Sequence, residues 1–100
     1  MERQNIYEKP LGYQQITSLS SAASLSIPAG TRLILITPEA QAVRWRDDGV
    51  SPTSSVGYPL ATGAELRYTG WQGAQPNLKF IEQTASAKLN VMYYALGEQS

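Results

Sequence analysis

The stretch from Arg32 to Gly49, RLILITPEAQAVRWRDDG, decides the fold that the rest of the chain must follow. The unbroken apolar run from Leu33 to Ile36 predicts a strand that is covered on both faces. The segment from Val43 to Arg46 alternates apolar and basic residues, which predicts a second, half-buried strand with Trp45 on its core side. Two neighbouring strands at the centre of the chain therefore indicate a β-domain.

Shorter segments with apolar alternation lie on both sides of this stretch, separated by turn signals about every 8–12 residues. Ile27 to Gly30 predicts a type I turn with Pro28 second and Gly30 fourth. No segment has a clean helical period. The pattern predicts an all-β, single-domain antiparallel β-sandwich, jelly-roll-like, of about seven or eight short strands. Strands are expected over residues 12–17, 23–27, 33–36, 43–46, 58–60, 64–68, 78–80 and 87–95.

The two ends of the chain differ from its middle. Residues 1–10 are polar and charged and are closed by a proline, which predicts an extended N-terminal arm. This arm is either a frayed terminus or a segment that docks on a neighbouring subunit through Ile6 and Tyr7. Residues 11–96 are expected to form the sandwich, and residues 97–100 a loose C-terminal tail.

Length and charge restrict the function. The 100 residues fit one domain, and eight basic against eight acidic residues give a net charge of zero. We expect no nucleic-acid or membrane partner, because both favour a basic excess. The chain has no cysteine, hence no disulfide and no thiolate metal site. No stretch approaches the roughly 20 apolar residues of a membrane span, and the N-terminus lacks the apolar core of a signal peptide.

Residue types that serve catalysis are scarce. The chain has no histidine, which is the commonest general base and zinc ligand, and no glycine-rich phosphate loop. Asp47 and Asp48 either contribute to a calcium site with loop carbonyls or favour a tight turn before Gly49. The turn is preferred because no third carboxylate lies nearby in the sequence. We therefore expect a protein that is not an enzyme, with no catalytic residue, cofactor or metal.

Several residues are candidates for contact with a partner. Arg44 and Arg46 either bind an anionic partner or pair across strands with Glu65. Trp71 lies in a loop rich in glycine and either plugs one end of the sandwich or anchors an interface. A two-layer domain cannot cover both faces of the 33–36 strand unless a loop, an arm or another subunit lies over the second. The candidate interface residues are Ile6, Tyr7, Ile34, Ile36, Arg44, Arg46 and Trp71.

Four motifs carry a family resemblance: LSIPAG at 25–30, AQAVRWRDDG at 40–49, PLATG at 59–63 and LNVMYY at 89–94. Together with the segments between them, they resemble small virion structural proteins of tailed bacteriophages. The resemblance implies a β-sandwich that is made in the bacterial host cytoplasm and sits on the outer capsid surface as a decoration, or cement, protein. It further implies a homo-oligomer, with a trimer favoured, that bridges neighbouring subunits of the major capsid protein.

Two other roles stay open at this point. A component of the neck, tail or baseplate has the same kind of sequence, because the shared motifs are those of strands and turns. A module of the virion that binds host-surface glycan is the second, with Trp71 and either Tyr68 or Tyr58 as stacking platforms for sugar rings. An enzyme is a distant alternative.

Overall fold

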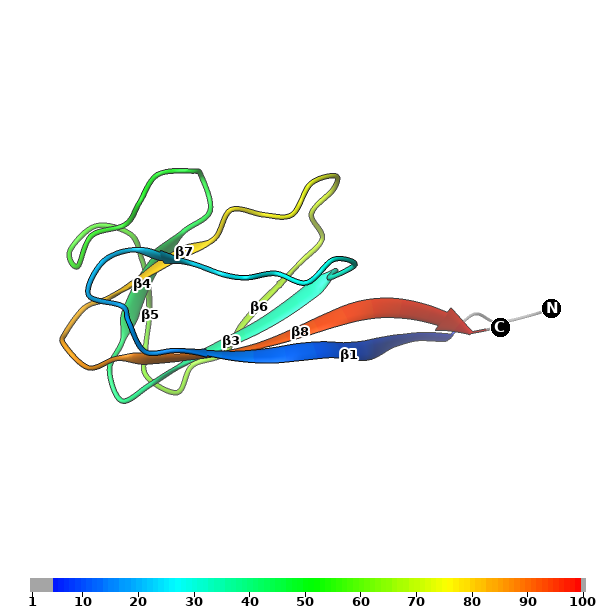
Figure 1. The fold of residues 1–100 in the computed structure, drawn as a ribbon, viewed down its shortest axis with the longest axis horizontal. Helices are drawn as coiled ribbons and strands as arrows, with labels where there is room; N and C mark the ends of the chain where they lie inside the picture. Colours follow the sequence, from blue (N-terminus) through cyan, green and yellow to red (C-terminus); the bar gives the residue numbers. More distant parts are fainter. Residues whose placement is uncertain (1–4, 100) are drawn as a thin grey trace.

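The computed structural model describes residues 5–99, with side chains described from residue 8 to residue 96. Within this range the chain is all-β, and it contains no helix of the length and apolarity that a membrane span requires. The strands are β1 (Asn5–Ile16), β2 (Ala23–Ser24), β3 (Leu33–Glu39), β4 (Val43–Arg46), β5 (Tyr58–Leu60), β6 (Leu66–Thr69), β7 (Lys79–Glu82) and β8 (Lys88–Gln99) (Figure 1).

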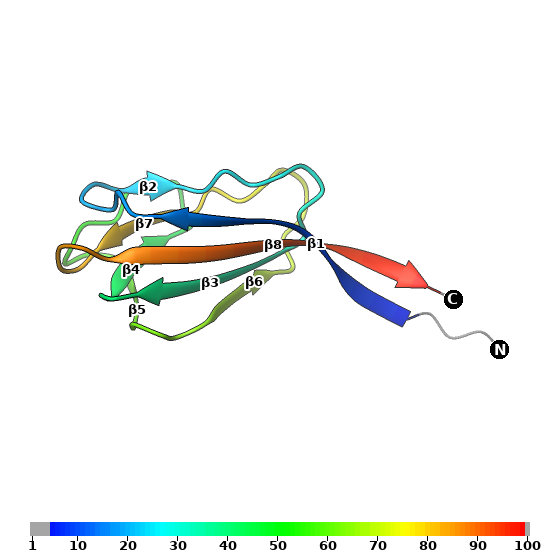
Figure 2. The same cartoon turned by 60° about the horizontal axis from the view of Figure 1, so that its bottom comes forward.

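The strands form two antiparallel sheets of four, in the orders β1-β8-β3-β6 and β2-β7-β4-β5. The pairs β1·β8, β2·β7, β3·β6 and β4·β5 are those of one long hairpin, which is rolled up so that β8 also meets β3 and β7 also meets β4. This is the strand order of a jelly roll, so the predicted fold class is confirmed. Figure 2 shows the sheet of β1, β8, β3 and β6.

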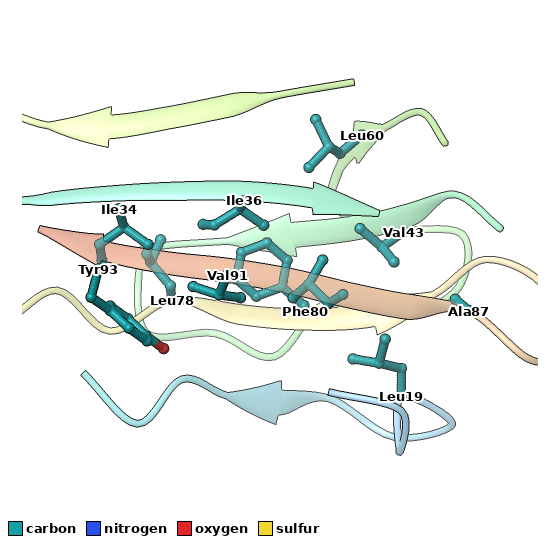
Figure 3. Close-up of a cluster of buried hydrophobic side chains, with 11 residues drawn as sticks. Leu19, Ile34, Ile36, Val43, Leu60, Leu78, Phe80, Ala87, Val91 and Tyr93 are labelled. Carbon is teal, nitrogen blue, oxygen red and sulfur yellow. The ribbon is translucent and has the colours of Figure 1, made fainter. Parts of the chain in front are cut away.

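The core lies between the two sheets, where side chains from alternate positions of each strand meet (Figure 3). On β3 the inward positions are Ile34, Ile36 and Pro38, and all three are buried. The core consists of Leu19, Ile34, Ile36, Val43, Leu60, Leu78, Phe80, Ala87, Leu89, Val91 and Tyr93.

The assignment of Ile34 and Ile36 to a contact surface is wrong, because both side chains are fully buried between the sheets. An unbroken apolar run does not tell which alternate set points inward, and here the partner strands β6 and β8 fix that choice. The outward set contains Leu33 and Leu35. Leu33 is also buried, as the sequence predicted, whereas Leu35 is partly exposed.

The first and last strands continue past the body of the molecule as a two-stranded ribbon. β8 pairs with β3 only from Lys88 to Tyr94, but it pairs with β1 as far as Gln99. Both figures show these strands projecting from one end of the sandwich. The ribbon lengthens the molecule to 53 × 25 × 19 Å. We call residues 5–9 of β1 with residues 95–99 of β8 the ribbon.

The ribbon corrects the predicted ends of the chain. The arm is extended as expected, but residues 5–10 are paired in β1, and residues 97–99 belong to β8 rather than to a loose tail. Both segments are polar, so neither carries an alternating pattern, and each obtains its strand partner from the other end of the sequence. The side chains of Ile6 and Tyr7 lie outside the described residues, so their contact with a neighbouring subunit stays a prediction.

A β-bulge turns the ribbon relative to the sheet. The register of β1 against β8 shifts between Pro10 and Gly12, and bulges increase the local twist of a strand pair. In Figure 2, β1 crosses β8 where the pair leaves the body. Glu8, which lies on β1 before this bulge, forms an ion pair with Arg67 on β6, at 2.5 Å between Oε2 and Nη2. The first strand therefore contacts the far edge strand of its own sheet.

The turn before β3 differs from its prediction by one position. The amide of Thr31 donates to the carbonyl of Pro28 at 3.3 Å, and the Thr31 hydroxyl donates to the same oxygen at 2.7 Å. Pro28 is therefore the first residue of the turn, and Gly30 is the third, with a φ of +87° that favours glycine. The buried Thr31 hydroxyl supplies the hydrogen bond that fixes this register.

Candidate functional site

The connection between β4 and β5 is held against the end of the sandwich by Arg44. Its guanidinium donates to the carbonyl of Ser54 at 3.2 Å through Nε and to the carbonyl of Gly57 at 2.8 Å through Nη1. The predicted pairing with Glu65 is wrong, because β4 pairs with β5 and β7, whereas Glu65 precedes β6 in the other sheet. Arg44 therefore shapes this loop through backbone carbonyls.

Arg46 also pairs locally. Its Nε and Nη2 donate to the two carboxylate oxygens of Asp48, at 3.0 and 2.5 Å, a two-point geometry that suits a planar guanidinium. The Asp48 carboxylate also accepts the amide of Val50 at 3.3 Å, and Gly49 has a φ of +83°. The predicted turn is confirmed. Within the described part of the chain, no three acidic side chains gather as a calcium site would require.

Because of its contact with Arg46, the Asp48 carboxyl has a pKa of about 2, below its ordinary value of 3.8. A lowered pKa favours the folded state above the ordinary value, so this contribution is lost as the pH falls from about 4 through about 2. We expect an NMR titration of the Asp48 carboxyl to give this low midpoint. In Arg46→Gln the midpoint should rise toward 3.8, and a midpoint unchanged by that substitution would contradict the assigned cause.

Five aromatic side chains contact one another in a row that includes Trp45 on β4. The Trp45 ring stacks on Phe80 with a centroid distance of 6.3 Å, and it meets Tyr68 edge-on at 6.1 Å and Tyr58 at 5.8 Å. Tyr68 continues the row to Trp71 at 5.7 Å. Trp45 packs against the core as predicted but is only partly buried. Its outer part is therefore available at the surface.

Trp71 closes the sandwich next to this row. Its ring contacts Tyr68, and the Arg32 guanidinium carbon lies 5.2 Å from the ring centroid, an arrangement that favours a cation–π interaction. Nη2 of Arg32 also donates to the Trp71 carbonyl. The ring is partly buried and packs on the core, which matches the plug interpretation. These contacts within the chain occupy the Trp71 ring, which the sequence offered as a sugar platform together with either Tyr68 or Tyr58.

An open depression lies between β4, β5 and the turn after β4. It has a volume of about 320 Å³ and is lined by Trp45, Arg46, Asp47, Asp48, Gly57 and Tyr58. We call it the β4–β5 depression. Tyr58 lies at its wall and is 69% exposed. A Cβ at Gly57 would lie 3.0 Å from Cβ of Pro52 and 3.1 Å from Cβ of Arg44, so a larger residue there requires these neighbours to shift. The backbone at the rim is therefore closely packed.

Asp47 is fixed at the depression by a hydroxyl from the other sheet. Tyr68 donates its phenolic O–H to Oδ2 of Asp47 at 2.8 Å. Burial first, and then this hydrogen bond, raises the pKa of Tyr68 to about 12, so the hydroxyl keeps its proton at neutral pH. The sequence identified Asp47 and Asp48 as turn residues, but it contained no signal that the turn faces Tyr58 across a depression, because that placement depends on how the loop folds.

Comparisons of the chain with family models, with curated proteins and with solved structures give no match.

Proposed function

We propose that this chain is a structural protein of a phage particle, a capsid decoration protein that stabilises the head by bridging subunits of the major capsid protein. The observation that carries the proposal is the ribbon. In it, β1 and β8 continue beyond the compact jelly roll, and their outer edges pair with no strand in the described chain. Unpaired strand edges are templates for strand addition by a partner. Jelly rolls also recur among viral capsid domains.

The edge of β8 suits a partner strand better than the edge of β1. On β1 the exposed edge carries Lys9, Pro10 and the bulge, which are features that discourage edge pairing. On β8 the segment from Ala95 to Gly97 has no charge and no proline, and Leu96 is 44% exposed. A strand of the capsid protein laid along this segment would continue the sheet beyond the end of β3.

The direction of the backbone groups agrees with this choice. The carbonyl of Tyr94 points to the β3 side, where it accepts the amide of Arg32 at 2.8 Å. Backbone groups along a strand alternate between its two edges, so Leu96, two residues on, presents its N–H and C=O to the same side. Since β3 has no residue opposite Leu96, this pair of groups faces outward from the ribbon.

Binding through such contacts stabilises an assembled shell by mass action, because the protein engages the assembled form and not the separate subunits. A homo-oligomer, with a trimer favoured, presents several ribbons at once, and linked contacts raise the overall affinity without any new interaction.

Copy number in purified virions tests the proposal. We expect quantitative mass spectrometry of the phage that encodes the chain to give a number comparable to that of the major capsid protein. Electron microscopy should place the density on the outer head surface. In solution the mass should be three times 10.9 kDa. A few copies located at the neck, tail or baseplate would replace the head assignment with the alternative structural role, and absence from virions would reject both.

A further inference from the structure

We propose that the β4–β5 depression binds a neutral hexopyranose ring, with one face of the sugar on Tyr58 and its hydroxyls on Asp47 and Asp48. The inference is independent of the proposed role in the capsid. It rests on the aromatic wall, the fixed polar rim and the charge of the depression.

The aromatic wall has the shape that a pyranose ring requires. The rings of Trp45 and Tyr58 are tilted by 53° with centroids 5.8 Å apart, so they form an open corner rather than a closed stack. Tyr58 exposes most of its ring, whereas Trp45 is braced from behind by Phe80. The C–H groups on one face of a pyranose pack on an aromatic ring, while its hydroxyls point outward around the edge. We therefore expect the Trp45 and Tyr58 rings to contact a sugar without a change in their arrangement.

The polar groups at the rim are already ordered. Asp47 is held by the Tyr68 hydroxyl, and Asp48 is held by two nitrogens of Arg46. A carboxylate has about four lone-pair positions, so each retains acceptor capacity for sugar hydroxyls. Nη1 of Arg46 donates to no described residue and is available to a sugar oxygen. Binding then costs little side-chain ordering, which improves affinity.

Charge and size select the class of ligand. Two carboxylates and one guanidinium give the lining a net charge of −1, which disfavours uronic acids and phosphorylated sugars. The volume of about 320 Å³ is at the small end of ligand sites, which span roughly 300–1,000 Å³, and suits one ring. A protein partner requires a far larger surface, on the order of 1,000 Å² in total. A single neutral sugar unit, free or terminal on a glycan, is therefore the occupant that fits.

The test uses the full chain labelled with nitrogen-15 and a panel of methyl hexosides, hexosamines and hexuronic acids. The two tryptophans give two indole N–H signals, which Trp71→Phe assigns. A neutral hexoside should shift the Trp45 signal saturably and leave the Trp71 signal in place. Tyr58→Ala should weaken binding about tenfold, and Asp47→Asn should also weaken it. Tyr13→Ala removes another exposed tyrosine, on β1, and should bind as the unchanged chain does.

Several results would overturn the site. One is the absence of a saturable Trp45 shift with every neutral hexoside. Another is wild-type affinity in Tyr58→Ala, and a third is a preference for hexuronic acids. The position of the Trp71 indole signal in each variant reports whether the fold is intact, so a loss of binding with that signal unchanged is a loss at the depression. Failure of sugar binding would leave the location of the protein in virions unaffected.

Discussion

Replacing Phe80 by alanine is expected to lower the free energy of unfolding by about 3–5 kcal/mol. The ring is fully buried on β7 between the sheets, and it supports Trp45 from behind. Its removal leaves a cavity in the middle of the core and also removes an aromatic pair worth about 0.5–1.5 kcal/mol. A small domain has only about 5–15 kcal/mol in total, so the variant should be close to unfolding at room temperature.

Urea unfolding followed by circular dichroism measures this effect. The matched control is Tyr58→Ala, which removes another aromatic ring in contact with Trp45, from a residue that is 69% exposed. Loss of the exposed Tyr58 leaves no buried cavity, so the cost should be limited to that of its aromatic pair with Trp45, about 0.5–1.5 kcal/mol. If both variants lower the transition midpoint equally, then Trp45 does not rest on a packed core as described.

The central strands were predictable because their signals are local. Alternation in the segment from Val43 to Arg46 and the apolar run of β3 each follow from burial of side chains on one face or two. The turn before Gly49 was equally predictable from its residues, and Gly49 has a positive φ. These features depend on residues adjacent in the sequence, so they can be predicted from one sequence alone.

The ends of the chain were not predictable in this way. β1 and β8 pair over residues separated by most of the sequence, from Asn5 with Gln99 to Ile16 with Leu89. The stability of such a pair derives largely from backbone hydrogen bonds, which carry no residue signature. The same limit applies to β3, where the partner strands decided that Ile34 and Ile36 face the core.

The candidate site likewise combines a feature that the sequence predicts with features that depend on the fold. The turn at Asp47, Asp48 and Gly49 is a sequence feature, but the depression exists because Arg44 fixes the following loop through its carbonyls and Tyr68 reaches Asp47 from the other sheet. These interactions join residues 10 to 21 positions apart in the sequence. The sequence offered Trp71 with either Tyr68 or Tyr58 as sugar platforms. The structure separates them, because Trp71 is in contact with Tyr68 and Arg32, whereas Tyr58 is 69% exposed.

The proposed attachment to phage heads predicts a second large effect: Leu96→Pro should weaken binding of the protein to heads assembled without it. Leu96 presents its N–H to the unpaired edge of the ribbon, and proline removes that donor while preserving an extended backbone. A buried carbonyl of the partner strand would lose its hydrogen bond, at about 1–3 kcal/mol or 5- to 150-fold for each copy. Several ribbons acting together would multiply the loss.

Two further substitutions separate the contribution of the Leu96 N–H from that of the Leu96 side chain and from the effect of loosening the ribbon. Leu96→Ala keeps the N–H and trims only the side chain, so it should retain more binding than Leu96→Pro. Ala95→Pro removes a group that faces β1, opposite Lys9, and should loosen the ribbon, which hydrogen exchange of the β1 amides reports. Co-sedimentation with heads measures attachment. Wild-type attachment of Leu96→Pro would show that the edge of β8 is not the contact, because the ladder between β1 and β8 is left intact by that change.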